Sequence, residues 1–137
     1  MIEQTTRYGI STTVALPYEQ AVQKTRDALA AEGFGVLTEI DVAATLKKKL
    51  DVDFRPYIIL GACNPPLAHR ALSAERDIGL LLPCNVVVYA ADEEGSSVVA
   101  AMDPVAALSL TGNADIEPVA QEVKQRLERA LSVVGKS

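Results

Sequence analysis

The 137-residue chain has no tryptophan, and aromatic residues make up only 4% of it. Such a composition offers few flat side chains on which bases can stack. Basic residues are also in the minority, 13 against 18 acidic residues, which gives a formal net charge of −5. Because nucleic-acid binding depends on a basic surface, both deficits argue against a nucleic-acid partner. The core must be built mainly from Ala, Val, Leu and Ile.

Long apolar runs are also missing. No segment reaches the roughly 18 uninterrupted apolar residues that a membrane-spanning helix requires. The first ten residues, MIEQTTRYGI, contain no basic region that leads into an apolar run. We therefore expect a soluble, cytoplasmic protein without membrane contact. Its two cysteines are expected to be reduced thiols, because disulfides are rare in the cytoplasm.

The length and the apolar content bound the domain count. With 49% apolar residues, 137 residues can bury one substantial core but are too few for two ordinary domains. We expect one domain over residues 1–137, with no internal repeat and no linker.

The periodicity of apolar residues predicts an alternation of strands and helices. The first half of the chain is predicted to contain a strand over 8–16, a helix from 18 that stops at Gly33, a strand over 34–40 and a short helix over 42–50 capped by Asp41. The second half is predicted to contain a strand over 57–63, a short helix over 65–75, a hairpin of strands over 84–90 and 97–102, and a long helix from 116 to about 135. This order predicts an α+β fold in which helices cover one face of a mainly antiparallel sheet.

Two segments of this pattern lead to more specific expectations. Residues 57–63, YIILGAC, are almost all apolar, which is typical of a central strand covered on both faces. Residues 103–113, DPVAALSLTGN, show no clear period, and we expect an irregular connection there.

The chain places both of its cysteines in the same dipeptide, Cys-Asn, with a proline beside each copy. Cys63-Asn64 precedes Pro65, and Cys84-Asn85 follows Pro83. Cys63 would end one strand, and Cys84 would begin the next. If these strands are neighbours in the sheet, both sulfurs and both asparagines gather at one rim.

The dipeptides have two interpretations. In the structural one, cysteine is a small buried residue and asparagine caps a helix or forms a turn. In the chemical one, Cys63 lies beside the N-terminus of a helix, whose positive end favours the thiolate. Such a sulfur could bind a metal, carry a persulfide or cycle with Cys84.

His69, the only histidine, follows shortly after Asn64. Cys63, His69 and Cys84 together would supply three soft ligands with an open fourth position, as in catalytic zinc sites. Their spacing matches no established zinc motif, so the metal remains undetermined, and the alternative is a surface histidine with no ligand role.

Other chemistry has less support in the sequence. No serine lies in a GxSxG context, and no glycine-rich phosphate loop occurs. The run from Lys47 to Lys49 could receive an anion, but a solvated helix face explains it better. No cofactor and no reaction can be named, and whether the protein is an enzyme stays open.

Two blocks carry a resemblance to a known family. YIILGACNPPLAHRAL, followed by GLLLPCNVVVY, resembles the family called domain of unknown function 302, over nearly the whole chain. The residues that match its motif are Gly61, Cys63, Asn64, Pro65, Leu82, Pro83, Cys84 and Asn85. The resemblance implies a TATA-binding-protein-like order of one strand, one helix, four strands and one helix, with short helices inserted, and a homodimer. The family's name records no activity, and a shared architecture does not confer DNA binding.

These observations predict a binding module for a small molecule, or for sulfur or a metal. Its cleft would be lined by Cys63, Asn64, Cys84 and Asn85, with His69 nearby. The asparagine amides would supply hydrogen-bond donors and acceptors, and the thiols would supply soft contacts. The alternative is a structural or interaction protein that acts as a homodimer without a ligand.

Overall fold

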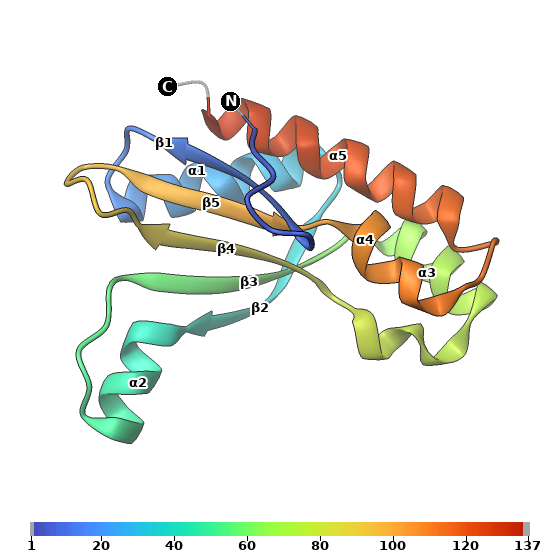
Figure 1. Ribbon diagram of the computed structural model, residues 1–137, viewed down its shortest axis with the longest axis horizontal. Coiled ribbons are helices and arrows are strands. Elements are labelled where there is room, and N and C mark those ends of the chain that lie inside the picture. The colour runs from blue at the N-terminus through green and yellow to red at the C-terminus, as the bar shows by residue number, and fades with distance from the viewer. Residues whose placement is uncertain (1, 136–137) are drawn as a thin grey trace.

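A computed structural model describes residues 2–135 of the chain. Its centre is a five-stranded sheet in the order β1-β5-β4-β3-β2, and every neighbouring pair is antiparallel (Figure 1). The strands are β1 (Gly9–Val14), β2 (Gly35–Asp41), β3 (Tyr57–Cys63), β4 (Cys84–Ala90) and β5 (Ser97–Met102). The helices are α1 (Tyr18–Ala31), α2 (Val42–Leu50), α3 (Pro65–Ala74), α4 (Pro104–Leu108) and α5 (Glu117–Gly135), with 3₁₀ turns over Arg76–Leu81 and Ser109–Thr111. The predicted α+β class and the antiparallel sheet are confirmed. The predicted similarity to the arrangement of the TATA-binding protein stays a prediction.

The two long helices, α1 and α5, pack against one face of the sheet and against each other. Alternation along each strand sends every second side chain into that layer. On the central strand β4, Val86 and Val88 are fully buried, whereas Val87 between them is only half-buried. The buried apolar side chains of the sheet and the helices form one continuous cluster. We call this side of the sheet the helix face and the other side the open face.

Local signals set the helix boundaries near the predicted positions. Asp41 accepts a hydrogen bond from the backbone N–H of Ala44 at 2.9 Å, so it caps α2 as expected. Gly33 follows the end of α1 with a φ of 84°, a left-handed conformation that glycine adopts without strain.

Two expectations require correction. β3 is not covered by helices on both faces: it lies next to the edge strand β2, and alternate side chains such as Ile59 lie on the open face. Residues 103–113 are not irregular, because Asp103 caps the short helix α4 by accepting hydrogen bonds from two backbone N–H groups. Unlike α1 and α5, α2 buries none of its residues and projects beyond one end of the sheet in Figure 1.

Within residues 2–135, no helix is both long and apolar enough to cross a membrane.

Candidate functional site

A cavity of about 310 Å³ lies at the end of the sheet where β3 ends and β4 begins. The register of these strands pairs Ala62 with Cys84, so the two halves of the sequence motif meet there. α3 and α5 supply the opposing walls. We call this cavity the motif pocket. Its lining residues are Phe34, Leu37, Thr38, Ala62, Cys63, Asn64, Leu67, Ala68, Ala71, Leu72, Gly79, Leu82, Pro83, Cys84, Leu108, Val119 and Val123.

The motif pocket is strongly apolar. No charged side chain is among the described residues that line it, and its polar side chains are confined to Thr38, Asn64 and the two thiols. Leu67 and Ala71, one helical turn apart on α3, are both buried and form part of its wall. Such a site favours an apolar molecule, because a charge transferred into it would lose its hydration without gaining a partner.

Cys84 lies in the wall of the motif pocket with only 6% of its surface exposed. Burial, followed by the neighbouring Cys63, raises the pKa of its thiol from 9.0 to about 11. The group is therefore a neutral thiol at pH 7, whereas the nucleophilic and metal-binding form is the thiolate. Cys63 is half-buried, also lines the pocket, and forms no disulfide with Cys84.

Asn64 has the capping role that the sequence predicts. Its Oδ1 accepts a hydrogen bond from the backbone N–H of Leu67 at 3.3 Å, and Pro65 occupies the first position of α3. The residue is only 8% exposed and lines the motif pocket. The capping bond fixes which end of the side-chain amide is the oxygen, so the Nδ2 group points the other way, towards Gly33.

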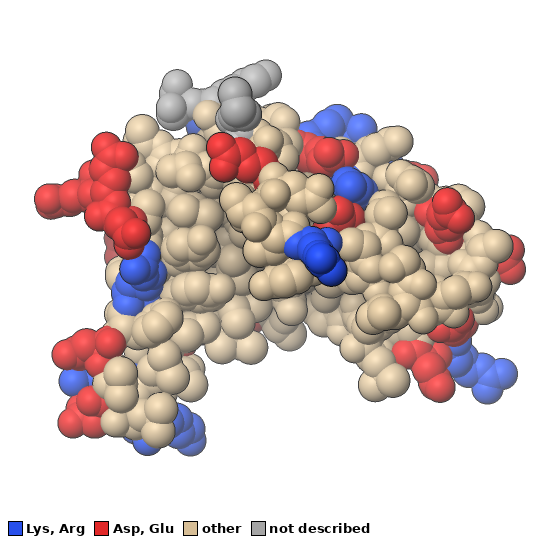
Figure 2. All heavy atoms as spheres, viewed as in Figure 1, with Lys and Arg blue, Asp and Glu red and all other residues tan. Residues whose placement is uncertain are grey.

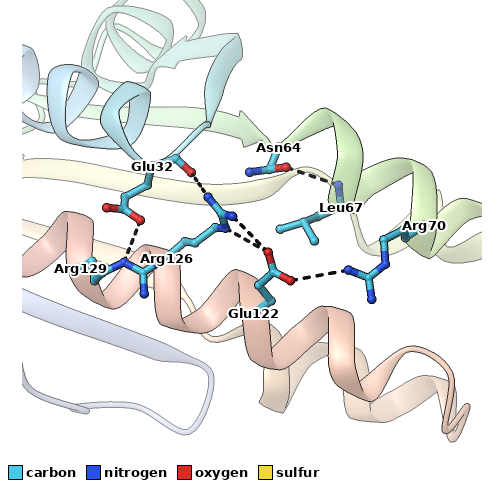
Figure 3. Close-up of polar contacts among 7 residues, drawn as sticks. All are labelled: Glu32, Asn64, Leu67, Arg70, Glu122, Arg126 and Arg129. Atoms are coloured by element: carbon cyan, nitrogen blue, oxygen red, sulfur yellow. Dashed lines mark hydrogen bonds and ion pairs between the residues drawn. The ribbon is translucent and has the colours of Figure 1, made fainter.

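A polar network joins the C-terminal end of α1 to α3 and α5 beside the motif pocket (Figure 3). Arg126 donates to the backbone oxygen of Glu32 at 3.0 Å and to the carboxylate of Glu122 at 3.1 and 3.2 Å. Glu122 also pairs with Arg70 of α3 at 3.5 Å. Arg129 pairs with the Glu32 carboxylate at 2.9 Å. The network ties together three helices, and Leu67, Val119 and Val123 of two of them line the pocket.

Asn85 does not share this site. It is the next residue after Cys84 in β4, so its side chain falls on the open face, where it is exposed and lines a different hollow of about 390 Å³. The expectation that both asparagines gather at one corner is therefore not met. The physical reason is the two-residue period of a strand, which sends the side chains of a dipeptide to opposite faces.

His69 is also separated from the cysteines. It is exposed on α3, whereas Leu67 and Ala71 form the buried side of that helix. Across residues 2–135, no group of three or more His, Cys, Asp or Glu side chains is placed to hold a metal ion. The set of Cys63, His69 and Cys84 is thus not assembled in the fold.

The open face is a feature that the sequence motifs did not indicate. Tyr57 and Tyr89 are directly paired across β3 and β4, and their rings stack with centroids 5.2 Å apart and planes 7° apart. Burial, then the neighbouring tyrosines Tyr89 and Tyr8, raises the pKa of Tyr57. The middle of this face carries Ile59, Val87 and Ala100 rather than charges, and charged groups gather mainly around its margins (Figure 2).

The sequence pattern also did not identify the remaining residues that line the motif pocket. Val119 and Val123 of α5 and Phe34 belong to apolar stripes that predict core packing, and nothing in a stripe marks the positions that border a cavity. The only available signal was the pairing of the two Cys-Asn blocks.

Comparisons with known proteins agree with this fold. No curated protein matches the chain. A crystal structure of an uncharacterized conserved DUF302 protein from Bacillus stearothermophilus is similar, with a TM-score of 0.83 and 28% sequence identity over 91% of this chain and 96% of that chain. The model of the family described as domain of unknown function DUF302 matches residues 10–134. Since this match spans most of the sequence, the chain belongs to the DUF302 family.

Proposed function

We propose that the protein is a small-ligand binding module and that the motif pocket is its binding site. The observation that carries the proposal is the cavity of about 310 Å³ at the junction of the two motif halves. This volume lies at the lower end of the range of ligand pockets, about 300–1,000 Å³. The pocket is open to solvent on one side, so a ligand can enter it, and most of its wall is apolar, as in most small-molecule sites.

The placement of the motif residues supports this proposal over a purely structural role for the motif. Cys63, Asn64, Pro83 and Cys84 come from two segments of the chain and border the same cavity. Gly61, another motif residue, leaves room for the side chains of Thr38 and Pro83, which line the cavity, because a Cβ there would overlap Thr38 and lie 2.9 Å from Cγ of Pro83.

The geometry favours simple binding over sulfur or metal handling. Cys84 is a neutral thiol at pH 7, and His69 lies outside the pocket. Cys63 remains the one thiol of the pair with substantial solvent access. The thiols in this proposal are therefore soft contacts in the pocket wall.

Filling the motif pocket tests the proposal. Ala68 of α3 is half-buried and lines the pocket, whereas Ala74 of the same helix is exposed and does not. We expect small apolar molecules to shift the NMR signals of pocket residues in the wild type and in Ala74→Leu. We expect the same additions to leave Ala68→Leu unchanged. Equal responses in all three proteins, or no response to any small molecule, would contradict the proposal.

A second candidate role, homodimer formation, is supported by the open face. Two conditions favour an interface between copies of this chain. The surface should carry no charge, because a chain with a net charge of −5 otherwise repels its own copy. It should also carry aromatic residues, which are enriched at interfaces. The sheet face around Tyr57, Val87 and Tyr89 meets both conditions, so we infer that a second copy of the chain covers it. Dimerisation and ligand binding use different faces of the sheet and are compatible.

The compartment we propose is the cytoplasm. Both cysteines are unpaired, which agrees with a reducing environment.

A further inference from the structure

We infer that the ligand of the motif pocket is an uncharged, mainly apolar molecule of about ten non-hydrogen atoms with one hydrogen-bond acceptor that meets the Nδ2 group of Asn64. The inference rests on the proposed function and specifies its ligand class. It combines the volume of the cavity, the chemistry of its wall and one unused donor.

The volume limits the size of the ligand. A water molecule in the liquid occupies about 30 Å³, so a cavity of about 310 Å³ holds roughly ten atoms of similar size. A molecule of this size corresponds to a substituted benzene or a medium-length chain. A nucleotide or a coenzyme is several times larger and would extend out of the pocket into solvent.

The wall excludes a charged ligand. The lining side chains are aliphatic apart from Phe34, Thr38, Asn64 and the two cysteines, and no Asp, Glu, Lys, Arg or His is among the lining residues that the structure describes. The arginines of the network beside the pocket already have partners, and Arg70 pairs with Glu122. Arg126 binds Glu122 and the backbone of Glu32, and Arg129 binds Glu32. A carboxylate in the pocket would therefore be buried without a counter-ion, at a large cost in free energy.

Asn64 supplies the single polar contact. Its Oδ1 is occupied by the cap of α3, and its Nδ2 donates to no acceptor among residues 2–135. Among residues 2–135, Thr12 Oγ1 is the one fully buried side-chain polar atom without a hydrogen-bond partner, so Nδ2 of Asn64, which also has none, keeps some accessible surface through which a ligand can reach it. Figure 3 shows the amide nitrogen turned away from Leu67. A carbonyl, ether or hydroxyl oxygen on the ligand would satisfy this nitrogen.

Four probes of similar size separate the possibilities: isopropylbenzene, acetophenone, benzoate and benzylammonium. Acetophenone has nearly the shape of isopropylbenzene but carries a carbonyl acceptor, and the other two carry opposite charges. We expect isopropylbenzene and acetophenone to bind in NMR titrations. Benzoate and benzylammonium should bind at least roughly tenfold more weakly than acetophenone, because their charges would be buried.

One substitution isolates the amide donor. Asn64→Ser keeps a side-chain oxygen that can cap α3 and loses Nδ2 without adding a charge. We expect it to weaken acetophenone binding by roughly two- to tenfold, as the loss of one hydrogen bond implies, and to change isopropylbenzene binding by less. Asn85→Ser makes the same chemical change on the open face and should leave both affinities unaltered.

The outcomes distinguish this inference from the proposed function. If isopropylbenzene binds and acetophenone binding does not depend on Asn64, the pocket binds ligands but the assigned donor is wrong. Tighter binding of benzoate than of acetophenone would also overturn the inference, because it would show that the nearby arginines recognise an anion. If none of the four probes binds to the motif pocket, the proposed function itself fails.

Discussion

Cys84 and Asn85 are consecutive residues of β4, yet their side chains lie on opposite faces of the sheet. Cys84 is 6% exposed and lines the motif pocket, whereas Asn85 is exposed on the open face. The second Cys-Asn dipeptide therefore contributes to two different surfaces. In the first dipeptide, β3 ends at Cys63 and Asn64 caps α3, so both residues remain beside the motif pocket.

The two asparagines should differ in their effect on stability. Asn64→Ala removes the cap of α3 and should lower the free energy of unfolding by about 1 kcal/mol. Asn85→Ala removes an exposed side chain for which no hydrogen bond is seen among residues 2–135, and its effect should stay within about 0.5 kcal/mol. Urea denaturation of the two variants measures the difference. Equal losses would contradict the capping role of Asn64.

The buried thiol of Cys84 should make stability depend on pH in the alkaline range. Because the pKa of this thiol is raised from 9.0 to about 11 in the folded protein, the unfolded chain loses the proton first. The buried thiol therefore contributes about 2–3 kcal/mol to the free energy of unfolding below pH 9, and this contribution is lost as the pH rises towards 11.

The pH dependence that comes from all other groups cancels when the stability of the wild type is compared with that of Cys84→Ala. The stability difference between the wild type and Cys84→Ala should be constant below pH 9 and should decrease between about pH 9 and 11. Cys63→Ala serves as the control and should keep most of the wild-type slope, because burial is the main cause of the shift. A difference that does not change with pH would show that Cys84 reaches solvent.

Gly61 should tolerate no side chain. A Cβ there would overlap Oγ1 of Thr38 and lie 2.9 Å from Cγ of Pro83. Gly61→Ala should therefore destabilise the fold by about 1–3 kcal/mol, the usual cost of overpacking. Gly35, on the neighbouring strand β2, has no atom within 4 Å of the position that a Cβ would occupy, so Gly35→Ala should change stability by less than about 1 kcal/mol.

A second substitution tests the cause of the Gly61 effect. Thr38→Ala removes the hydroxyl that the new Cβ would meet, and it should recover part of the stability lost in Gly61→Ala. Thermal denaturation of the two single variants and the double variant measures the coupling. Strictly additive effects would indicate that Thr38 is not the obstacle.

A charge in the middle of the open face should prevent dimerisation. Val87 is half-buried there and pairs with Ile59 and Ala100 on the two adjacent strands. Val87→Arg would place a charge at the inferred interface of each copy, and light scattering should then report half the wild-type mass. Val133→Arg, at an exposed position on α5, should keep the wild-type mass. A wild-type monomer, or a dimer that survives Val87→Arg, would contradict the open-face dimer.

Much of this fold follows from local patterns in the sequence. β3 has its predicted bounds because YIILGAC is an uninterrupted apolar run after Pro56. The ends of α2 and α3 follow from Asp41 and Asn64, whose side chains cap helices by contacts within three residues. Such short-range chemistry is encoded locally and can be read without the rest of the chain. α4 was missed because its five residues are too few to show a helical period.

The candidate site depended on contacts that no local pattern contains. Cys63 and Cys84 were expected to meet, because adjacent strands bring their ends together, and the register of β3 and β4 provides this. The two-residue period, a local property of any strand, sends the side chains of Cys84 and Asn85 to opposite faces and so separates the two asparagines that were expected at one corner. Only the tertiary structure decided which face the helices cover, and therefore that Cys84 is buried while Asn85 is exposed. The cavity has the same origin, because its walls come from β2, β3, β4, α3, α4 and α5, and its volume depends on how those elements pack against one another.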